Sequence, residues 1–321
     1  MDPIDFAVYR YLSPDGLVRF WGSRRVVDPR VSAREIADRV GLSEAGVRIR
    51  LRGLEQRGFL RGRETGVNPS LFDVSLVVSE IPIREPSEAD RVLRELALVD
   101  GVTFARDVLD EKDREIRVFY VSDNPSATAR RTALLKRMAP SGELRGPTPY
   151  WIPACEHALS RLDWRLLRAY RRHPEAGVGD LAKVVGISLK TTALHFRRLL
   201  ESRACWSSLS MESEEMPLAL LTVEVGETAA RASVATAVAR ANPVWIPAAP
   251  DGLGVSPSES PLPVAGLVPA EAPAALEQSI RKTRAIEGVA RVSRTFALGS
   301  ASYPAWVDER LAEAESPSAP G

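Results

Sequence analysis

Three side chains spaced one helical turn apart carry chemistry that suits a DNA groove. Glu44, Arg48 and Arg52 recur at every fourth position, so in a helix they lie along one face. A guanidinium group on such a face can donate two parallel hydrogen bonds to guanine. Arginines beside the face can neutralise phosphates, which hold the protein on the duplex without reading its sequence. The spacing therefore predicts a helix that reads base edges.

These residues need a helix-turn-helix to position them, and the stretch from Val31 to Arg63 predicts one. Gly41 is expected to end a first short helix, where a left-handed residue is common. Ser43 suits the N-cap of the second helix, because its hydroxyl can accept a bond from a free amide. Apolar residues at helical spacing predict that the helices pack together: Ile36, Ala37 and Val40 in the first, and Val47, Leu51 and Leu54 in the second.

The charge of this stretch is basic, although the chain as a whole is nearly neutral at +1. Between Arg30 and Arg63 there are nine arginines against four carboxylates, a local net charge of about +5 at neutral pH. Arg50 is expected on the flank of the second helix, which ends at Gly58. The run Arg61 to Arg63 is predicted to form the tip of a basic wing.

The chain then repeats the whole pattern. Residues Val178 to Ala204 align without a gap to the opening stretch, at an offset of 145 positions. Gly186, for example, aligns with Gly41, since 186 minus 41 is 145. Such a repeat is a stronger signal than a single motif. Between Arg161 and Arg203, ten lysines and arginines stand against four carboxylates, so the second copy is basic as well.

The second copy differs from the first in what its exposed face offers. That face is predicted to carry Leu189, Lys190, Ala193, Leu194 and Arg197. His195 is expected on the flank, facing solvent. The segment after the helix is acidic near its end, which makes a poor wing. The DNA-contacting residues predicted from both copies are Ser43, Glu44, Arg48, Arg50, Arg52, Arg61, Arg63, Ser188, Lys190, Thr191, His195, Arg197 and Arg198.

Each helical pair is followed by segments that alternate as β-α-β-β-α-β, the ferredoxin-like order. The fold class predicted is therefore α+β, with two winged helix-turn-helix domains alternating with two ferredoxin-like domains. The expected boundaries are 1–66 and 158–212 for the helix-turn-helix domains, and 67–153 and 215–305 for the ferredoxin-like domains. Residues 306–321, rich in Ala, Ser, Pro and Glu, are expected to be a disordered tail.

Composition excludes several classes of protein. The chain has 321 residues, 45% hydrophobic and 26% charged, so about two to four globular domains are expected. Cys155 and Cys205 are its two cysteines, and their wide separation excludes a zinc finger and favours a reducing cytoplasm. No stretch approaches about 18 consecutive apolar residues, so no membrane contact is expected. The β-rich segments contain no glycine-rich phosphate loop, His/Cys cluster or nucleophile elbow, so no metal, cofactor or enzymatic activity is expected.

The opening stretch together with the domain order resembles the Lrp/AsnC family of prokaryotic transcription regulators. The resemblance implies a DNA-binding head and a ferredoxin-like domain that binds a small-molecule effector and forms oligomers. The family usually has one of each per chain, whereas this chain has two, and its effector positions cannot be matched here. The matching positions are Ser32, Glu35, Ile36, Ala37, Gly41, Leu42, Ser43, Val47, Arg50, Leu54, Glu55, Gly58, Asn68 and Pro69.

The duplication has a consequence for the DNA site. Lrp/AsnC dimers pair two ferredoxin-like domains and display two heads, so one chain with both halves can form that dimer within itself. Because the two heads are not identical, the preferred double-stranded DNA is expected to be an asymmetric pair of half-sites rather than a palindrome.

Two alternatives use the same scaffold. Sirohaem decarboxylases, which resemble this family, perform tetrapyrrole chemistry and need proton donors and cationic anchors in a pocket. This chain has three histidines, and none lies in the β-rich segments. The second alternative is a protein-interaction module with degenerate heads, which the weak second wing favours. DNA binding through several phosphates would distinguish these cases by its steep dependence on salt.

Overall fold

The computed structural model describes residues 4–5, 7–8, 32–57, 62–110, 113–150, 152, 154–155, 157–210, 218–226, 231–242, 246–247, 264–269 and 273–315. The chain is α+β, as predicted. It divides into two compact units, each assembled from separate stretches of sequence. The sheet unit comprises Met1–Arg10, Leu76–Trp151 and Glu212–Ser302. The helical unit comprises Tyr11–Ser75, Ile152–Met211 and Tyr303–Gly321.

The first half of the sheet unit has the predicted β-α-β-β-α-β order. Its elements are β2 (Ser75–Ile83), α5 (Pro86–Glu95), β3 (Val102–Leu109), β4 (Arg114–Ser122), α6 (Pro125–Met138) and β5 (Arg145–Tyr150), with a short 3₁₀ turn η2 (Leu96–Leu98) after α5. The strands are arranged in the order β5-β2-β4-β3. Both helices contact β4, which is buried along most of its length. This is the ferredoxin-like arrangement expected from the sequence.

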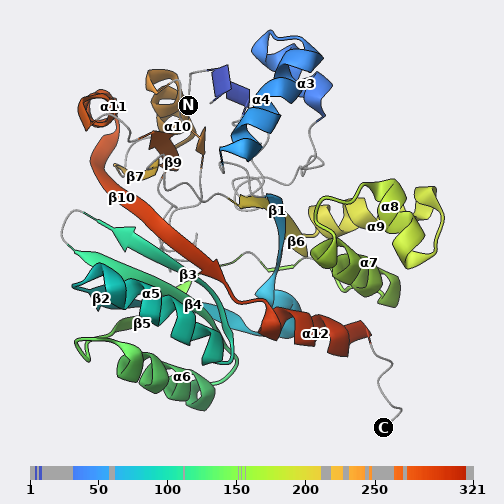
Figure 1. The fold of residues 1–321 in the computed structure, drawn as a ribbon, viewed down its shortest axis with the longest axis horizontal. Coiled ribbons are helices and arrows are strands. Elements are labelled where there is room, and N and C mark those ends of the chain that lie inside the picture. Colours follow the sequence, from blue (N-terminus) through green and yellow to red (C-terminus); the bar gives the residue numbers. More distant parts are fainter. Residues whose placement is uncertain are drawn as a thin grey trace. The chain divides into compact units, whose positions relative to one another are not determined.

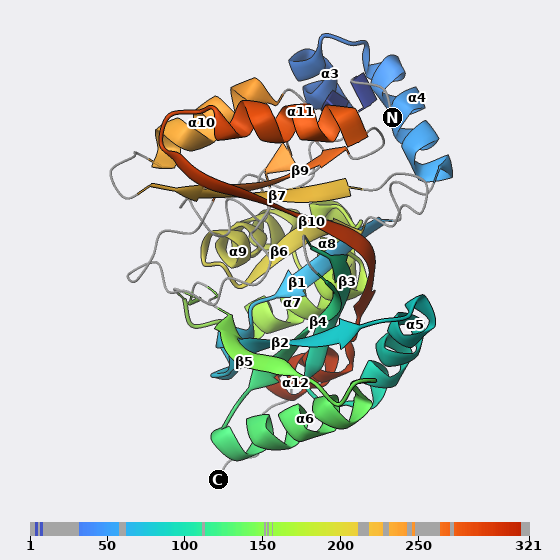
Figure 2. The ribbon, with the colours of Figure 1, turned by 90° about the vertical axis from the view of Figure 1, so that its left-hand side faces the viewer.

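The second half repeats this arrangement in a reduced form. Its elements are β7 (Leu218–Val225), α10 (Arg231–Ala241), β8 (Ile246–Pro247), β9 (Val264–Pro269), α11 (Pro273–Arg284) and β10 (Val289–Ser302). The strand order is β10-β7-β9-β8, which matches the first half position by position. Figure 2 shows α10 and α11 covering this part of the sheet. Aliphatic residues from both helices and three strands form its core, including Leu221, Val238, Leu276, Ile280 and Val292.

The two halves form one eight-stranded sheet through β10. The first part of β10, from Val289 to Phe296, pairs with β7, and the second part, from Phe296 to Ser302, pairs with β3. The pairing with β3 shifts between Ala297 and Gly299, where one extra residue bulges. Figures 1 and 2 show this long strand running through both halves. A single strand therefore joins the two repeats of the sheet unit.

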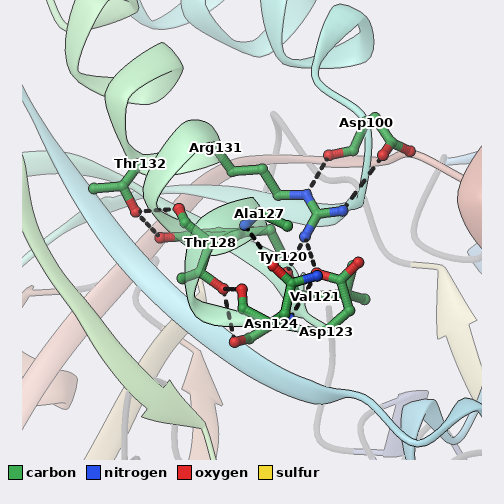
Figure 3. A network of polar contacts seen from close by, with 10 residues as sticks. Asp100, Tyr120, Val121, Asp123, Asn124, Ala127, Thr128, Arg131 and Thr132 are labelled. Carbon is green, nitrogen blue, oxygen red and sulfur yellow. Dashed lines mark hydrogen bonds and ion pairs between the residues drawn. The ribbon is translucent and has the colours of Figure 1, made fainter.

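A buried arginine fixes α6 to the sheet in the first half (Figure 3). Arg131 donates to the backbone carbonyls of Asp100 and Val121 at 2.9 Å and to the carboxylate of Asp123 at 2.8 Å. The bond from Arg131 lowers the pKa of Asp123. Gly101 adopts φ +81°, and a Cβ there would lie 2.7 Å from Arg131 Nε. All of these contacts hold structure together, so we assign Arg131 no binding role.

The helical unit contains the two helix-turn-helix copies. The first copy has α3 (Ala33–Val40) and α4 (Glu44–Gln56), and the second has α7 (Arg161–Arg172), α8 (Val178–Val185) and α9 (Leu189–Glu201). In the second copy all three helices contact one another. Tyr170 of α7 packs edge-on against Phe196 of α9, with ring centroids 4.8 Å apart.

The strands that follow the two copies pair with each other. Strand β1 (Gly62–Val67) runs antiparallel to β6 (Cys205–Ser210) over its whole length, from Gly62 opposite Ser210 to Val67 opposite Cys205. The sequence predicted instead a separate wing after each copy, with Arg61 to Arg63 at the tip of the first. Pairing the two strands satisfies backbone groups that neither short strand could satisfy alone. Arg61 and the side chain of Arg63 lie outside the described residues.

The end of β1 is tied to the start of β6 by a buried asparagine. The amide of Asn68 donates to the Ala204 carbonyl at 2.9 Å, and its side chain donates to the Arg203 carbonyl at 2.8 Å. Asn68 also caps the short 3₁₀ turn η1 (Pro69–Phe72) through Ser70 N–H. Asn68 therefore fastens the end of β1 to the start of β6.

The expectation of a disordered tail from residue 306 is wrong for most of that segment. Helix α12 (Ala305–Glu315) packs against α7 in the helical unit. Trp306 and Leu311 are buried, and the Trp306 ring meets Phe72 edge-on at 5.5 Å. Ion pairs join α12 to Arg168 and Arg171 of α7. Apolar burial and these ion pairs offset the low propensity that composition suggested. Residues 316–321 lie outside the described residues.

Candidate nucleic-acid interface

The first helix-turn-helix is built as the sequence predicted up to Gln56, where α4 ends; Gly58, the expected end of that helix, lies outside the described residues. Ser32 and Glu35 form a reciprocal capping box at the start of α3, and Gly41 ends that helix in the left-handed conformation at φ 69°. The hydroxyl of Ser43 accepts the Gly46 amide at 3.0 Å and so begins α4. Ile36 and Ala37 of α3 and Val47 and Leu54 of α4 are buried, and Leu51 is half-buried.

The opposite face of α4, on which the sequence predicted Glu44, Arg48 and Arg52, is exposed. The exposed residues are Glu44, Ala45, Arg48, Ile49 and Arg52. Glu44 accepts two bonds from Arg48, at 3.1 Å from Nε and 2.6 Å from Nη2. This i,i+4 pair restrains the guanidinium of Arg48 on the exposed surface, while Arg52 stands one turn further along. Arg50 is half-buried on the flank.

The second copy uses the same devices. Gly186 ends α8 at φ 73°, and the hydroxyl of Ser188 accepts the Thr191 amide at 3.1 Å at the start of α9. The Thr191 hydroxyl lies 2.8 Å from Ser188 Oγ, so it takes part in this cap. Helix α9 buries Phe196, Leu199 and Leu200 against its neighbours. The exposed face of α9 is again the predicted one: Leu189, Lys190, Ala193, Leu194 and Arg197.

His195 does not face solvent as expected. Its side chain is 16% exposed, and Nδ1 lies 2.7 Å from Oδ1 of Asp163, which is fully buried. The other oxygen of Asp163 accepts the Ser160 amide at 2.8 Å and the Ser160 hydroxyl at 2.6 Å. Burial raises the pKa of Asp163, but the hydrogen bonds from Ser160 and His195 outweigh it and bring the pKa below its ordinary value.

This contact makes His195 a positioning residue, because it ties the recognition helix α9 to the start of α7. Asp163 is not among the residues predicted from the sequence. The Ser160–Asp163 spacing is that of a capping box, which was a usable signal for the carboxylate. Its partner, His195, lies 32 residues away along the chain, so no local sequence pattern could predict that the two side chains pair. Among the predicted DNA-contacting residues, Arg198 is half-buried, whereas Lys190 and Arg197 are exposed.

Other kinds of site find little support in the parts of the chain that the structure describes. These parts hold no group of three or more His, Cys, Asp or Glu side chains placed to bind a metal ion. None of their helices is both long enough and apolar enough to cross a membrane.

Comparisons with known proteins agree with these two helical copies. A family model described as winged helix-turn-helix DNA-binding matches the chain twice, over residues 26–61 and 159–202. The HTH-type transcriptional regulator LrpA of Mycobacterium tuberculosis (strain ATCC 25618 / H37Rv) is 30% identical over 124 residues. The aligned part covers 38% of this chain and 73% of LrpA.

Similar solved structures are more distant. The crystal structure of the siroheme decarboxylase NirDL aligns over 98% of both chains with 11% identity and a TM-score of 0.46. The crystal structure of Mycobacterium tuberculosis LrpA aligns over 45% of this chain and 88% of that one, with 24% identity and a TM-score of 0.31. An AsnC family transcriptional regulator from Agrobacterium tumefaciens aligns over 50% and 95%, with 18% identity and a TM-score of 0.30.

The two matches to the winged helix-turn-helix fall on the α3–α4 and α7–α9 copies, and the match to LrpA spans most of that regulator. This chain therefore belongs to the Lrp/AsnC family of DNA-binding transcription regulators.

Proposed function

We propose that this chain is a sequence-specific transcription regulator that binds double-stranded DNA with both of its helix-turn-helix copies. The observation that carries the proposal is the pair of exposed faces on α4 and α9. Each begins at a capping serine after a left-handed glycine, and each presents five exposed residues in register with the other. The first turns of such helices are the part that reaches base edges in known complexes.

The two copies belong to one chain that supplies both halves of a dimer-like arrangement. Support comes from each unit separately. In the sheet unit, β10 pairs with β3 and makes the two ferredoxin-like halves continuous. In the helical unit, β1 pairs with β6 and joins the strands that follow the two helix-turn-helix copies. We therefore propose an intramolecular pseudo-dimer of four domains with the boundaries expected from the sequence. These are 1–66 and 158–212 for the helix-turn-helix domains, and 67–153 and 215–305 for the ferredoxin-like domains.

The two recognition helices offer DNA different chemistry, so the site is an asymmetric pair of half-sites. Helix α4 presents the Glu44–Arg48 pair and Arg52, whereas α9 presents Lys190 and Arg197 between apolar residues. Arginine pairs bidentately with guanine, and both basic side chains can neutralise phosphates. A palindromic site would require two recognition helices with identical exposed faces, and the exposed faces of α4 and α9 differ.

Selection of bound duplexes from a random pool tests the proposal directly. We expect asymmetric sites and an affinity that falls steeply with salt, by a log–log slope of about −0.9 for each phosphate contacted. Recovery of perfect palindromes would contradict the unequal heads. A salt-independent interaction, or none, would contradict DNA binding itself and leave the protein-interaction alternative.

A small-molecule effector and association through the ferredoxin-like halves belong to the same proposal. A thermal shift on adding a candidate metabolite, together with a change in DNA affinity, tests the effector. The enzymatic alternative requires tetrapyrrole binding, which absorbance titration with a porphyrin tests. Binding with a defined stoichiometry would favour that alternative over a regulator alone.

A further inference from the structure

Two leucines on the recognition helix α9 stand in solvent although the same helix buries others. The side chains of Leu189 and Leu194 are 60% and 58% exposed, while Leu199 and Leu200 lie in the core. A single exposed leucine is ordinary on a protein surface. Here two of them, with exposed Ala193 between, occupy the face that the helix-turn-helix presents to DNA.

The same row of α4 carries charge instead. Positions four residues apart read Glu44, Arg48 and Arg52 in α4, and the equivalent row of α9 reads Leu189, Ala193 and Arg197. The ion pair that restrains Arg48 therefore has no counterpart at the equivalent positions of α9, where neither side chain can donate or accept a hydrogen bond. In the neighbouring row, Ile49 of α4, 65% exposed, corresponds to Leu194.

Apolar side chains in the major groove have one specific target. Of the groups that distinguish one base pair from another in the major groove, the methyl group of thymine is apolar and can be contacted by apolar side chains. The others are hydrogen-bond donors and acceptors. We propose that Leu189 and Leu194 read thymine methyl groups, so that α9 selects an A·T-rich half-site. This rests on the proposed function, and it names the chemistry that the second half-site must offer.

The charges around the leucines favour DNA over a protein as the occupant. Lys190 and Arg197 are exposed on the same face, and Lys183 and Arg198 lie on α8 and the flank of α9. No carboxylate lies between Leu181 and Leu200, and Asp180, just before that stretch, pairs with Lys183 at 3.3 Å. A basic rim around apolar centres complements a polyanion whose groove displays methyl groups.

Replacing thymine by uracil tests the proposal without altering the protein. Duplexes selected by the full chain are resynthesised with deoxyuridine at one thymine at a time, which removes the methyl group and keeps the O4 acceptor. We expect affinity to fall about fourfold for each methyl group that is read, from the burial of one CH₂-sized group. The positions that Leu189 and Leu194 read should lie together in one half-site.

Two variants then identify the side chains responsible. Leu189→Ala and Leu194→Ala should bind about fourfold more weakly or worse, and should no longer distinguish thymine from uracil at the position each reads. Leu134→Ala is the matched control, because Leu134 is also an exposed leucine on a helix, α6, at 44% exposure. The control should keep both the affinity and the discrimination of the wild type.

The outcomes separate this inference from the proposed function. Steeply salt-dependent binding that is indifferent to uracil at every position would overturn the inference and leave DNA binding intact. No salt-dependent binding to any duplex would overturn the function itself. If Leu189→Ala changed self-association in light scattering and left DNA binding unchanged, a second copy of the chain would be the occupant, and the inference would be wrong.

Discussion

At the residue scale, Arg48 and Arg52 are the exposed cations on the face of α4. We expect Arg48→Ala and Arg52→Ala each to weaken DNA binding by about 1–3 kcal/mol, because a guanidinium that pairs with a base has no substitute in alanine. Fluorescence anisotropy with a selected duplex at fixed salt measures this. Since neither side chain packs in the core, the free energy of unfolding should change little.

Arg91→Ala is a matched control for that experiment. Arg91 also lies on an exposed helix face and pairs with a glutamate four residues away, at 3.0 Å from Glu95, but it belongs to the sheet unit. It should leave DNA binding within experimental error of the wild type. Equal binding by all three variants would count heavily against α4 as the base-reading helix.

The Asp163–His195 contact predicts a dependence of stability on pH. The pKa of Asp163 lies below its ordinary value of 3.8 in the folded chain, so the native state binds its proton less readily than the unfolded state. Its contribution to stability is complete above the unfolded pKa and is lost as the pH falls through the folded one. Asp163→Asn cannot titrate, and at about pH 6 it should cost about 1–3 kcal/mol of unfolding free energy.

Urea unfolding at a series of pH values measures that difference. The gap between the wild type and Asp163→Asn should narrow as the pH falls below about 4, because the wild type then loses the contribution that the variant lacks. Asp180→Asn is the control, since the carboxylate of Asp180 is exposed and forms an i,i+3 pair with Lys183. A gap that stays constant down to pH 2 would show that Asp163 is not held ionised by this contact.

Periodicity predicted the exposed residues of both recognition helices, because the position around a helix depends on sequence spacing alone. It could not predict what each side chain touches. His195 turns inward because a carboxylate on another helix is buried beside it, and that carboxylate lies far along the chain. The equivalent position of the first copy is Arg50, so comparison of the two copies could not predict the contact between His195 and Asp163.

At the element scale, the ribbon of β1 and β6 depends on a glycine. Gly66 pairs with Trp206, and a Cβ at Gly66 would lie 2.1 Å from Cε2 of that indole. Gly66→Ala must therefore displace the Trp206 ring, and we expect it to lower the free energy of unfolding by about 1–3 kcal/mol. Chemical denaturation monitored by circular dichroism measures the change.

Gly179→Ala provides the opposite control. Gly179 lies in the first turn of α8, and a Cβ there meets no other atom within 4 Å. Alanine should therefore cost no stability and should raise it by at most about 0.5–1 kcal/mol, the gain expected in the middle of a helix. If Gly66→Ala were equally well tolerated, the close packing of Trp206 on the ribbon would be wrong.

Local patterns predicted most elements but not the partners that some of them find. The β-α-β-β-α-β order was readable twice, because each strand and helix has its own apolar period. The pairing of β1 with β6 was not, since those strands are separated by the whole first ferredoxin-like half. Composition also failed to predict α12, because the segment has few apolar residues among many polar ones. Two of those apolar residues, Trp306 and Leu311, are buried where α12 packs against α7 within the helical unit.

At the scale of the whole molecule, we propose that the duplication replaces a second subunit. Each repeat leaves strand edges that require partners, and within each unit the other repeat supplies them, through β10 to β3 and through β6 to β1. The net charge of the chain is only +1, so we expect the attraction to DNA to come from the two basic helical copies rather than from the molecule at large.

This arrangement predicts that one chain suffices for one complete DNA site. Light scattering of the complex with a selected duplex should give the mass of the duplex plus a single chain of 35.1 kDa. Binding should be non-cooperative in protein concentration, because no association step precedes it. Combining Arg48→Ala with Arg197→Ala should cost about as much as the two single changes added, since the two helices contact separate half-sites. Two chains on one duplex, with a concentration-dependent affinity, would show that the repeats pair between chains and that the pseudo-dimer is wrong.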